Sequence, residues 1–553
     1  MNLAIGLRNL RRVREIVSVL VLDYGFGYVF DQFDLARFFP LGRRRGIARE
    51  YAHLSGPQRL RLALGELGPT FIKLGQVLSA RADLLPAPVV AELRHLQDEA
   101  PAIPFEELRG IIETELGRPL EQCFEHIDPT PISAASLGQV HGATLRDGRQ
   151  VTVKVLRPGV NRIVEGDTQI LFDVAHILHR QVPSLQRYQL PTFVRRFATQ
   201  IEDELVYTLE AHNGERLARN LESAGMKVRL PAVIWSLTTG RVLTTERVHG
   251  RRVDRLFAPP AAFDRAAVAA ELARCLLHQM FVDGFFHGDP HQGNVLFEED
   301  GTILLLDWGI VGHVDLRMRR LLAEGMLRVY QDDVDGLVMV MSELGTVGPD
   351  TDLTALRADA ARILNRFVTL PRQEFPMGEL LTSVLRTMWT HHIHLPPELS
   401  LVGKALLMTE GICRELDPNF DSRAIAEPIV EEARKAMFSA AAISEQLFRG
   451  LEAAGRRLAK LPAKLDNVLS LLERGNLRFR IEDPGADTRW NMLTRGLNRL
   501  ALSVLSGALL LCSALYLSSA ATPLQLGLGV SAMVAGVLLG LVVLLALMRP
   551  GRL

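Results

Sequence analysis

The 553-residue sequence contains few cysteines and carries no net charge. Its four cysteines are scattered without a Cys-x-x-Cys spacing, which excludes a disulfide framework and a cysteine-bound zinc site and is typical of a reducing compartment. Lys and Arg together number 63, as do Asp and Glu, so the excess of positive charge typical of a nucleic-acid binder is missing. Because 48% of the residues are hydrophobic, the chain can bury a large core, and its length indicates more than one domain.

Two long segments near the C-terminal end contain no charged residue. Residues 500–519 and 524–548 each reach the roughly 20 apolar residues that a helix needs to cross a bilayer. A very short connection joins them, so we expect a two-helix transmembrane hairpin over residues 499–549. Arginines flank the hairpin and are missing from its turn, which predicts an inner-membrane protein with its large N-terminal part in the cytoplasm. A buried hairpin of a soluble protein is the alternative.

Small residues on this hairpin would let helices approach closely. They would also let a second copy of the chain pack against it, so a homodimer is one expected assembly. The residues concerned are Gly507, Gly527, Gly536 and Gly540.

The first 54 residues are basic and contain one short apolar run. The run Ile16–Leu22 is too short to span a bilayer, and no clean signal-peptide cleavage pattern follows it. We therefore expect residues 1–54 to form an amphipathic segment on anionic lipid. A second basic patch over residues 43–49 fits the same surface, although a solvated helix face explains that patch equally well.

The rest of the chain predicts an α+β protein-kinase-like fold of two lobes with an N-terminal helical extension. Residues 55–128 show the leucine spacing of helices. Residues 129–250 contain the strand-like runs GQVHGATL and QVTVKVL, which an Asp-Gly turn joins into a predicted hairpin. Residues 251–475 are mostly helical and include a second strand pair, NVLF and ILLL, and residues 476–498 are expected to be a linker. A strand-rich lobe followed by a helical lobe is the order of a kinase-like fold.

Three motifs in this order indicate phosphoryl transfer from ATP. Lys154 lies on the second strand of the predicted hairpin, where a kinase lysine reaches the α- and β-phosphates. The segment His287–Asn294 matches the H-x-D-x-x-x-x-N loop, in which Asp289 would orient or deprotonate the attacking hydroxyl or water. Asp307 follows a strand at the place of the metal-binding Asp-Phe-Gly. Asn294 and Asp307 supply the hard oxygen ligands that Mg²⁺ prefers, so they are the predicted metal ligands.

Histidines in this sequence also allow another interpretation. His287, Asp289 and His291 could ligate a transition metal, but the downstream Asn and Asp would then have no role. A second histidine group at residues 391–394 has no companion ligands nearby in the sequence, and we expect it at the surface or at a pocket rim.

Alanines stand where a kinase has its glycine-rich loop. Residues 133–138 read SAASLG instead of G-x-G-x-x-G, so Ala134, Ala135 and Ser136 are the expected nucleotide contacts. Alanine adopts positive φ less readily than glycine and holds the backbone further from the phosphates. Nucleotide preference and loop mobility should therefore differ from those of an ordinary protein kinase.

These motifs together resemble the UbiB/ADCK family of atypical kinase-like proteins over about residues 20–450. The resemblance depends on PTFIKLGQ, which is similar to the family's K-x-G-Q signature, on the alanine-rich loop, on VKV followed by RPG, and on the HGDPHQGN and Asp-x-Gly loops. The C-terminal hairpin resembles that of bacterial members. The resemblance implies a membrane-associated atypical kinase or ATPase that binds ATP and Mg²⁺ and supports ubiquinone biosynthesis. The implied partners are the lipid membrane, quinone precursors and other biosynthetic proteins, and not nucleic acid.

The resemblance also implies roles for Lys73 and Gln76 in the K-x-G-Q segment. In the family, the K-x-G-Q helices lie over the place where a protein substrate would dock, so both side chains would point into the nucleotide pocket and obstruct phosphorylation of proteins. Physical reasoning agrees in part with a position in the nucleotide pocket, because Lys and Gln on an apolar helix face are costly to bury without acidic or phosphate partners. A surface-facing pair on an ordinary helix is the alternative.

Acidic partners for the two lysines come from an E-x-D pattern in the family. We expect Glu210 to pair with Lys154, and Glu204 with Lys73. Val206 stands where the family has Asp, and Glu202 or Asp203 could supply the carboxylate contact in its place.

Three functions fit this pattern. The first is ATP hydrolysis coupled to quinone precursors or to the biosynthetic complex. The second is a protein or small-molecule kinase with a membrane-proximal substrate, and the third is a non-catalytic nucleotide-binding scaffold.

Overall fold

The computed structural model of the chain forms two compact units, residues 1–446 and residues 447–553. The predicted linker 476–498 and the basic patch 43–49 lie outside the described residues. The structure describes residues 10–26, 51, 53–79, 85–96, 100–256, 262–348, 351–368, 375–393, 395–396, 398–437, 501–515, 517 and 523–548.

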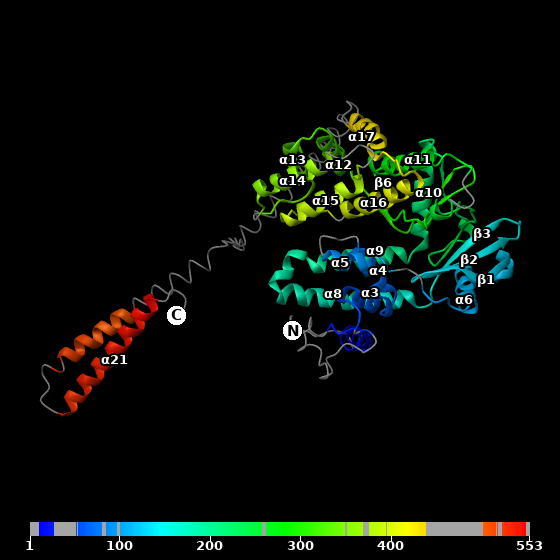
Figure 1. Cartoon of the computed structure of the whole chain (residues 1–553). Coiled ribbons are helices and arrows are strands. Elements are labelled where there is room, and N and C mark those ends of the chain that lie inside the picture. Colours follow the sequence, from blue (N-terminus) through cyan, green and yellow to red (C-terminus); the bar gives the residue numbers. More distant parts are fainter. Residues whose placement is uncertain are drawn as a thin grey trace, which may run out of the picture. The chain divides into compact units, whose positions relative to one another are not determined.

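The N-terminal helices lie close together (Figure 1), and their apolar side chains form a cluster that also includes Ile170. The elements of this N-terminal extension are α1 (Leu10–Val17), the π-helical segment η1 (Ser18–Asp23), α3 (Gly56–Glu66), α4 (Pro69–Ser79) and α5 (Ala87–Leu93). A capping box between Ser55 and Gln58 starts α3. Val13 and Ile16 are buried in the same cluster as Phe71 of α4.

The apolar run 16–22, which was expected to lie on lipid, is buried against this extension over its described side chains. Its valines and isoleucine find apolar partners inside the protein, which removes them from water without a bilayer. Arg12 fixes α1 to α8 (Val160–Gln181), because it donates to both carboxylate oxygens of Asp167 at 2.7 and 3.0 Å. The expectation of a lipid-facing apolar side is therefore wrong for this part of residues 1–54.

The strand-rich part contains an antiparallel four-stranded sheet in the order β1-β2-β3-β5. Its strands are β1 (Phe124–Ala134), β2 (Gly138–Leu145), β3 (Gln150–Leu156) and β5 (Val242–Glu246). The predicted hairpin is confirmed as β2 and β3, and Gly148 adopts a φ of 86° in its turn. The helices α6 (Phe105–Leu116) and α7 (Leu120–Cys123) share an apolar cluster with the sheet. Strand structure begins at Phe124, earlier than expected, because the residues directly after α7 already pair with β2.

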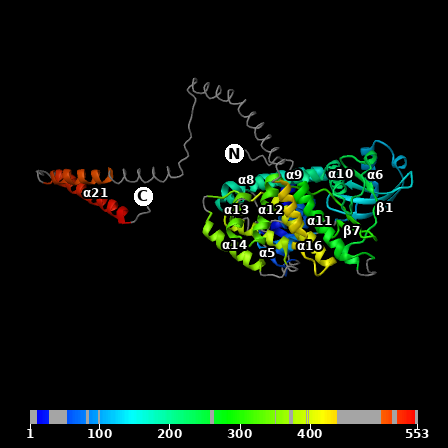
Figure 2. The ribbon, with the colours of Figure 1, turned by 90° about the horizontal axis from the view of Figure 1, so that it is seen from above.

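Four helical segments follow β3, and the short connection between the last two places two acidic residues near each other in the sequence. After α8 come the 3-10 helix η4 (Pro183–Tyr188), α9 (Leu190–Glu204) and α10 (Tyr207–Ser223). Helix α8 packs against α9, as Figures 1 and 2 both show. Because only two residues separate α9 from α10, Glu204 ends one helix and Glu210 lies in the first turn of the next.

The helical part surrounds two small sheets. The elements are β4 (Val228–Arg229), η5 (Trp235–Leu237), η6 (Val253–Arg255), α11 (Arg265–His278), η7 (Gln279–Asp283), β6 (Phe285–His287), β7 (Val295–Phe297), β8 (Ile303–Leu305) and β9 (Val311–His313). The predicted strand pair is confirmed as β7 and β8, with Val295 opposite Leu305. The first sheet has the order β4-β8-β7, and β6 pairs with β9. The segment between β6 and β7 is thereby held at both ends.

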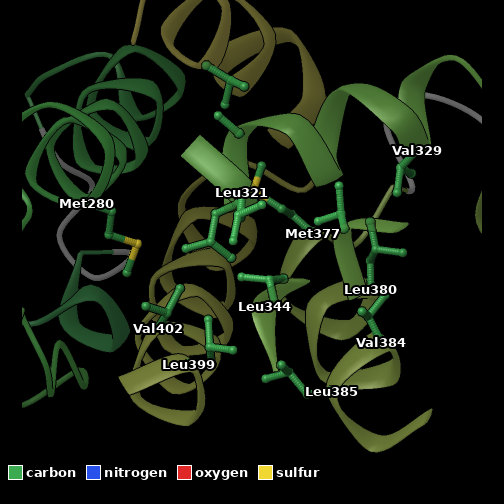
Figure 3. Close-up of a cluster of buried hydrophobic side chains, with 14 of the residues drawn as sticks. Met280, Leu321, Val329, Leu344, Met377, Leu380, Val384, Leu385, Leu399 and Val402 are labelled. Atoms are coloured by element: carbon green, nitrogen blue, oxygen red, sulfur yellow. The ribbon is translucent and has the colours of Figure 1, made fainter. Parts of the chain in front are cut away.

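Six further helices are described in the first unit, and they enclose the largest apolar cluster among its described residues. They are α12 (Leu316–Tyr330), α13 (Val334–Leu344), α14 (Leu353–Val368), α15 (Met377–Thr390), α16 (Glu398–Leu416) and α17 (Ser422–Met437). Figure 3 shows Leu321 of α12, Leu344 of α13 and Leu399 of α16 in this core. The predicted α+β class is therefore confirmed.

In the second unit, residues 501–515 and α21 (Pro523–Met548) are helical. They pack together, since Ser506 Oγ donates to the carbonyl oxygen of Gly536 at 2.8 Å. No helix among the described residues has the length and hydropathy to cross a membrane, so the predicted transmembrane hairpin is not shown.

Candidate functional site

A cavity of about 1210 Å³ in the first unit gathers nearly all the residues that the sequence singled out. Its walls come from α4, the β1–β2 loop, β3, α9, α10, the His287–Asn294 loop, and α15 and α16. Ser136 is the exception: it is buried and does not line the cavity, so its expected nucleotide contact is not supported. The predicted residues that line it are Lys73, Gln76, Ala134, Ala135, Lys154, Glu204, Glu210, Asp289, Asn294 and Asp307.

Lys154 stands between two carboxylates. It lies on β3 opposite Val140, and its Nζ is 2.9 and 3.0 Å from the two carboxylate oxygens of Glu210 and 3.4 Å from Asp307 Oδ2. Burial alone would lower the pKa of Lys154, but the charges of Asp307 and Glu210 outweigh it and raise the pKa well above its ordinary value. The ammonium group is therefore held charged, and the pairing with Glu210 expected from the sequence is present.

The two carboxylates of this group have pKa values shifted in opposite directions. Burial raises the pKa of Glu210 to about 7, even though Lys154 acts against it. The Asp307 side chain is 49% exposed; partial desolvation acts to raise its pKa, but Lys154 and Lys73 outweigh this and hold the pKa below its ordinary value. Asp307 therefore remains an anion at neutral pH, which suits a ligand of a divalent cation.

The structure tests whether Asn294 and Asp307 fit a bound Mg²⁺. The side-chain nitrogen of Asn294 donates to the carbonyl oxygen of Asp289 at 3.2 Å, so its oxygen is the atom that can ligate a cation. Asp307 has a φ of 53°, and its Oδ1 accepts from the backbone N–H of Gly309 at 3.2 Å. A non-glycine residue with positive φ is uncommon and is typical of functional sites. Both residues line the cavity, and their oxygens fit Mg²⁺.

His287 positions the loop through its ring. Its Nε2 is 2.9 Å from the carbonyl oxygen of Leu306, and its Nδ1 accepts from the backbone N–H of Asp289 at 3.1 Å. Burial lowers the pKa of His287, so the ring stays neutral. Since both ring nitrogens are used, the transition-metal interpretation loses a ligand. Among the described residues, moreover, no cluster of three or more His, Cys, Asp or Glu side chains could hold a metal.

The other histidine group lies elsewhere. Nε2 of His391 is 2.8 Å from a carboxylate oxygen of Asp359 on α14, and neither residue lines the cavity. His394 lies outside the described residues.

The K-x-G-Q helix α4 contributes a second buried ion pair. Lys73 Nζ lies 3.0 Å from Glu204 Oε2, and the two side chains are only 13% and 9% exposed. Gln76 Nε2 donates to the carbonyl oxygen of Leu96 at 3.4 Å. The predicted pairing of Lys73 with Glu204 is present, and the alternative of a surface-facing pair is wrong.

The alanine-rich loop is braced by backbone and side-chain hydrogen bonds. The backbone N–H of Ala135 donates to the carbonyl oxygen of Gly138 at 2.8 Å, and the carbonyl oxygen of Ala135 accepts from Nε of Arg157 at 2.8 Å. Ala100 donates to the carbonyl oxygen of Ala134 at 3.0 Å. The loop is therefore anchored on both sides by hydrogen bonds, and the expected difference in mobility from a glycine-rich loop stays a prediction.

Tyr207 belongs to the site and was missed in the sequence. Its ring centroid lies 5.2 Å from Lys154 Nζ, and its buried hydroxyl has no hydrogen-bond partner among the described residues. A Cβ on Gly138 would lie 2.3 Å from this hydroxyl, so glycine is required there. Tyr207 is the first residue of α10, and the sequence showed no helix break that would have marked it.

Lys404 of α16 was also missed. Its Nζ lies 2.8 Å from Asp289 Oδ1, and it lines the cavity. The helical spacing around residue 404 predicted a helix but could not show that this helix reaches the loop.

Comparison with known proteins finds two matching family models and relatives that share one name. The chain matches the ABC1 atypical kinase-like domain over residues 95–341 and the UbiB helical domain over residues 360–421. The "Probable protein kinase UbiB" of Xylella fastidiosa (strain 9a5c) is 34% identical over 400 residues, which cover 71% of this chain and 72% of that protein. The protein of the same name from Xanthomonas euvesicatoria pv. vesicatoria (strain 85-10) is 33% identical over 447 residues, covering 79% and 80%. A solved Mycobacterium tuberculosis protein in complex with erythromycin is 22% identical with a TM-score of 0.47, covering 66% of this chain and 93% of that one.

Proposed function

Because the chain belongs to the UbiB family of atypical kinase-like proteins, we propose that it binds Mg-ATP and transfers the terminal phosphoryl group to water in support of ubiquinone biosynthesis. The observation that carries this proposal is the convergence of Lys154, Asp289, Asn294 and Asp307 on one cavity. These residue types supply what phosphoryl transfer needs: a cation for the phosphates, oxygen ligands for the metal and a carboxylate beside the nucleophile.

Each residue would have a separate task. Mg²⁺ bound by Asn294 and Asp307 would neutralise the charge that develops on the phosphates. Lys154, held by Glu210, would bind the α- and β-phosphates, and Asp289 would orient the attacking water. The alanine-rich loop would cover the nucleotide. The Tyr207 hydroxyl has no hydrogen-bond partner within the part of the chain that the structure describes, and this supports a polar ligand here, because a buried polar group without a partner is costly.

Water is the proposed phosphoryl acceptor because side chains of α4 would occupy the space beside the nucleotide. Lys73 and Gln76 line the same cavity as Asp289, where a protein segment would have to enter. The second candidate, phosphorylation of a protein or small molecule near the membrane, is supported by the "protein kinase" in the relatives' names. A non-catalytic scaffold is disfavoured by the full set of catalytic residue types.

We also propose that the second unit attaches the chain to the inner membrane, with the kinase-like unit on the cytoplasmic side. Its described surface is strongly apolar: Leu511 and Leu515 are each 68% exposed, and Leu538 is 59% exposed. Contiguous exposed apolar surface marks membrane or protein contacts. The membrane would bring quinone precursors and other biosynthetic proteins within reach, and the same surface would allow a homodimer.

Labelled ATP tests the proposed activity. The purified full chain would be incubated with γ-labelled ATP, Mg²⁺, lipid vesicles and candidate proteins. Released phosphate supports the ATPase, labelled protein supports the kinase, and neither product supports the scaffold. Deleting the gene and measuring the quinone pool tests the biosynthetic role, since a normal pool in the deletion strain would contradict it.

A further inference from the structure

Lys404 brings a cation from the helical domain into the site. It lies on α16, within the stretch that matches the UbiB helical domain, and its Nζ is 2.8 Å from Asp289 Oδ1. The side chains of Lys404 and Asp289 are 20% and 22% exposed, and both line the cavity. The ammonium group therefore lies beside the carboxylate that would orient the attacking water.

The position of Lys404 is fixed by packing of α16 against the loop. A Cβ on Gly288 would lie 3.1 Å from Leu401 Cδ2, so the helix approaches the backbone closely at that residue. Further along, Gln292 Nε2 donates to a carboxylate oxygen of Glu415, also on α16, at 2.5 Å. The loop thus approaches α16 at three points, and the contact of Lys404 with Asp289 is the ion pair among them.

The loop itself provides no cation for the terminal phosphate. None of the four residues between Asp289 and Asn294 is Lys or Arg. The two other lysines of the cavity, Lys73 and Lys154, are paired with Glu204 and Glu210 on the α9 and α10 side. In phosphoryl transfer, charge spreads over the three equatorial oxygens of the transferred group, and a cation delivered from another element often stabilises it.

We propose that Lys404 is a catalytic residue whose ammonium group binds the terminal phosphate of Mg-ATP, while Asp289 sets its position. This inference rests on the proposed function. During hydrolysis, the bond between the terminal phosphorus and the bridging oxygen breaks, and its electron pair leaves with ADP. A bond forms between that phosphorus and the water oxygen, and a proton of the water passes to Asp289. Lys404 keeps its protons and stabilises charge on the transferred group.

The test compares nucleotides with and without the terminal phosphate. The full chain, Lys404→Met, Lys404→Gln, Lys404→Arg and the surface control Lys435→Met would be assayed for binding of Mg-ADP and of a non-hydrolysable Mg-ATP analogue, and for single-turnover hydrolysis. Both neutral variants should bind Mg-ADP within about twofold of the unmodified chain but the analogue about tenfold more weakly. Hydrolysis should fall by about 100-fold or more, as for loss of one preorganised transition-state donor. Lys404→Arg should recover part of the loss, and Lys435→Met should change neither quantity.

Two kinds of outcome would overturn the inference, and they are distinguishable. Suppose that the unmodified chain binds both nucleotides. If the neutral variants then keep its preference for the analogue, or bind both nucleotides more weakly by the same factor, Lys404 does not contact the terminal phosphate. If the unmodified chain binds neither nucleotide, the proposed function fails and this inference fails with it. Using two neutral variants guards against one that does not fold.

Discussion

Glu210 accepts hydrogen bonds from Lys154 on both of its carboxylate oxygens, at 2.9 and 3.0 Å. The contact joins the first turn of α10 to the middle of β3 and is the structural basis for a charged lysine in the cavity. Only 7% of the Glu210 side chain is exposed, so its protonation depends strongly on its surroundings.

Stability should therefore depend on the protonation of Glu210. Its pKa is raised to about 7 from 4.5, so between those pH values the native state binds more protons than the unfolded chain. Its contribution to the free energy of unfolding is fully present below pH 4.5 and is lost as pH rises through 7, by up to about 3 kcal/mol at roughly 1.4 kcal/mol for each pH unit. The lowered pKa of Asp307 acts in the opposite direction and only below about pH 3.8.

Urea unfolding of the full chain between pH 5 and 7.5 measures this dependence. In Glu210→Gln, the free energy of unfolding should fall less steeply as pH rises. Glu107→Gln, at an exposed helix position, should show the same pH dependence as the unmodified chain. An equal decline in Glu210→Gln and the unmodified chain would show that another group is responsible.

The pair of Lys73 and Glu204 predicts energetic coupling between α4 and α9. Removing one partner of a buried ion pair leaves a poorly compensated charge, so Lys73→Met should lower the free energy of unfolding by about 3 kcal/mol. The double variant Lys73→Met/Glu204→Gln should lose less than the two single changes added together, with a coupling of about 1 kcal/mol or more. Urea unfolding of the unmodified chain, the two single variants and the double variant measures this coupling energy. If the effects of the two single changes simply add in the double variant, the coupling is refuted.

Gly138 and Tyr207 predict a steric constraint on the nucleotide loop. A Cβ at residue 138 would lie 2.3 Å from the Tyr207 hydroxyl oxygen and 2.7 Å from the carbonyl oxygen of Val155. Gly138→Ala should therefore destabilise the protein by about 1–3 kcal/mol. Adding Tyr207→Phe should recover only part of the loss, because the backbone clash remains. Full recovery in the double variant, measured by thermal unfolding, would argue that Tyr207 alone imposes the constraint.

How much the sequence predicted depended on whether a feature was local. The hairpin of β2 and β3 and the pair of β7 and β8 follow from alternating apolar residues and turn residues, and both were predicted. The pairings of Lys154 with Glu210 and of Lys73 with Glu204 came from the family resemblance, since spacing alone does not show which charges meet. The burial of residues 16–21 was missed because an apolar run can be covered by protein or by lipid, and its sequence does not distinguish the two.

Contacts between distant elements were the least predictable part of the site. Lys404 follows Asp289 by more than a hundred residues, and its helix carries apolar residues that pack into the helical core, so nothing local marks it. Tyr207 was missed for a related reason, because the break between α9 and α10 contains neither Gly nor Pro. The packing of distant elements, and not the local sequence, brings Lys404 and Tyr207 to the cavity.

Asp307 provides the sharpest test of metal binding, because its backbone conformation suits a conservative substitution. Asn adopts positive φ more readily than most residues, so Asp307→Asn should keep the loop and remove only the charge, whereas Ala would add backbone strain. Affinity of the full chain for ATP should rise about tenfold or more with Mg²⁺, since the ion joins the carboxylate to the phosphates, and Asp307→Asn should lose this dependence. Titrations of each protein with ATP, with Mg²⁺ and with a chelator, measure the effect. Asp300→Asn, in an exposed turn where Asp300 accepts from Thr302, is the matched control and should behave as the unmodified chain. If Asp307→Asn keeps the Mg²⁺ dependence, Asp307 is not the metal ligand, and the role of the cavity in phosphoryl transfer has to be reassigned.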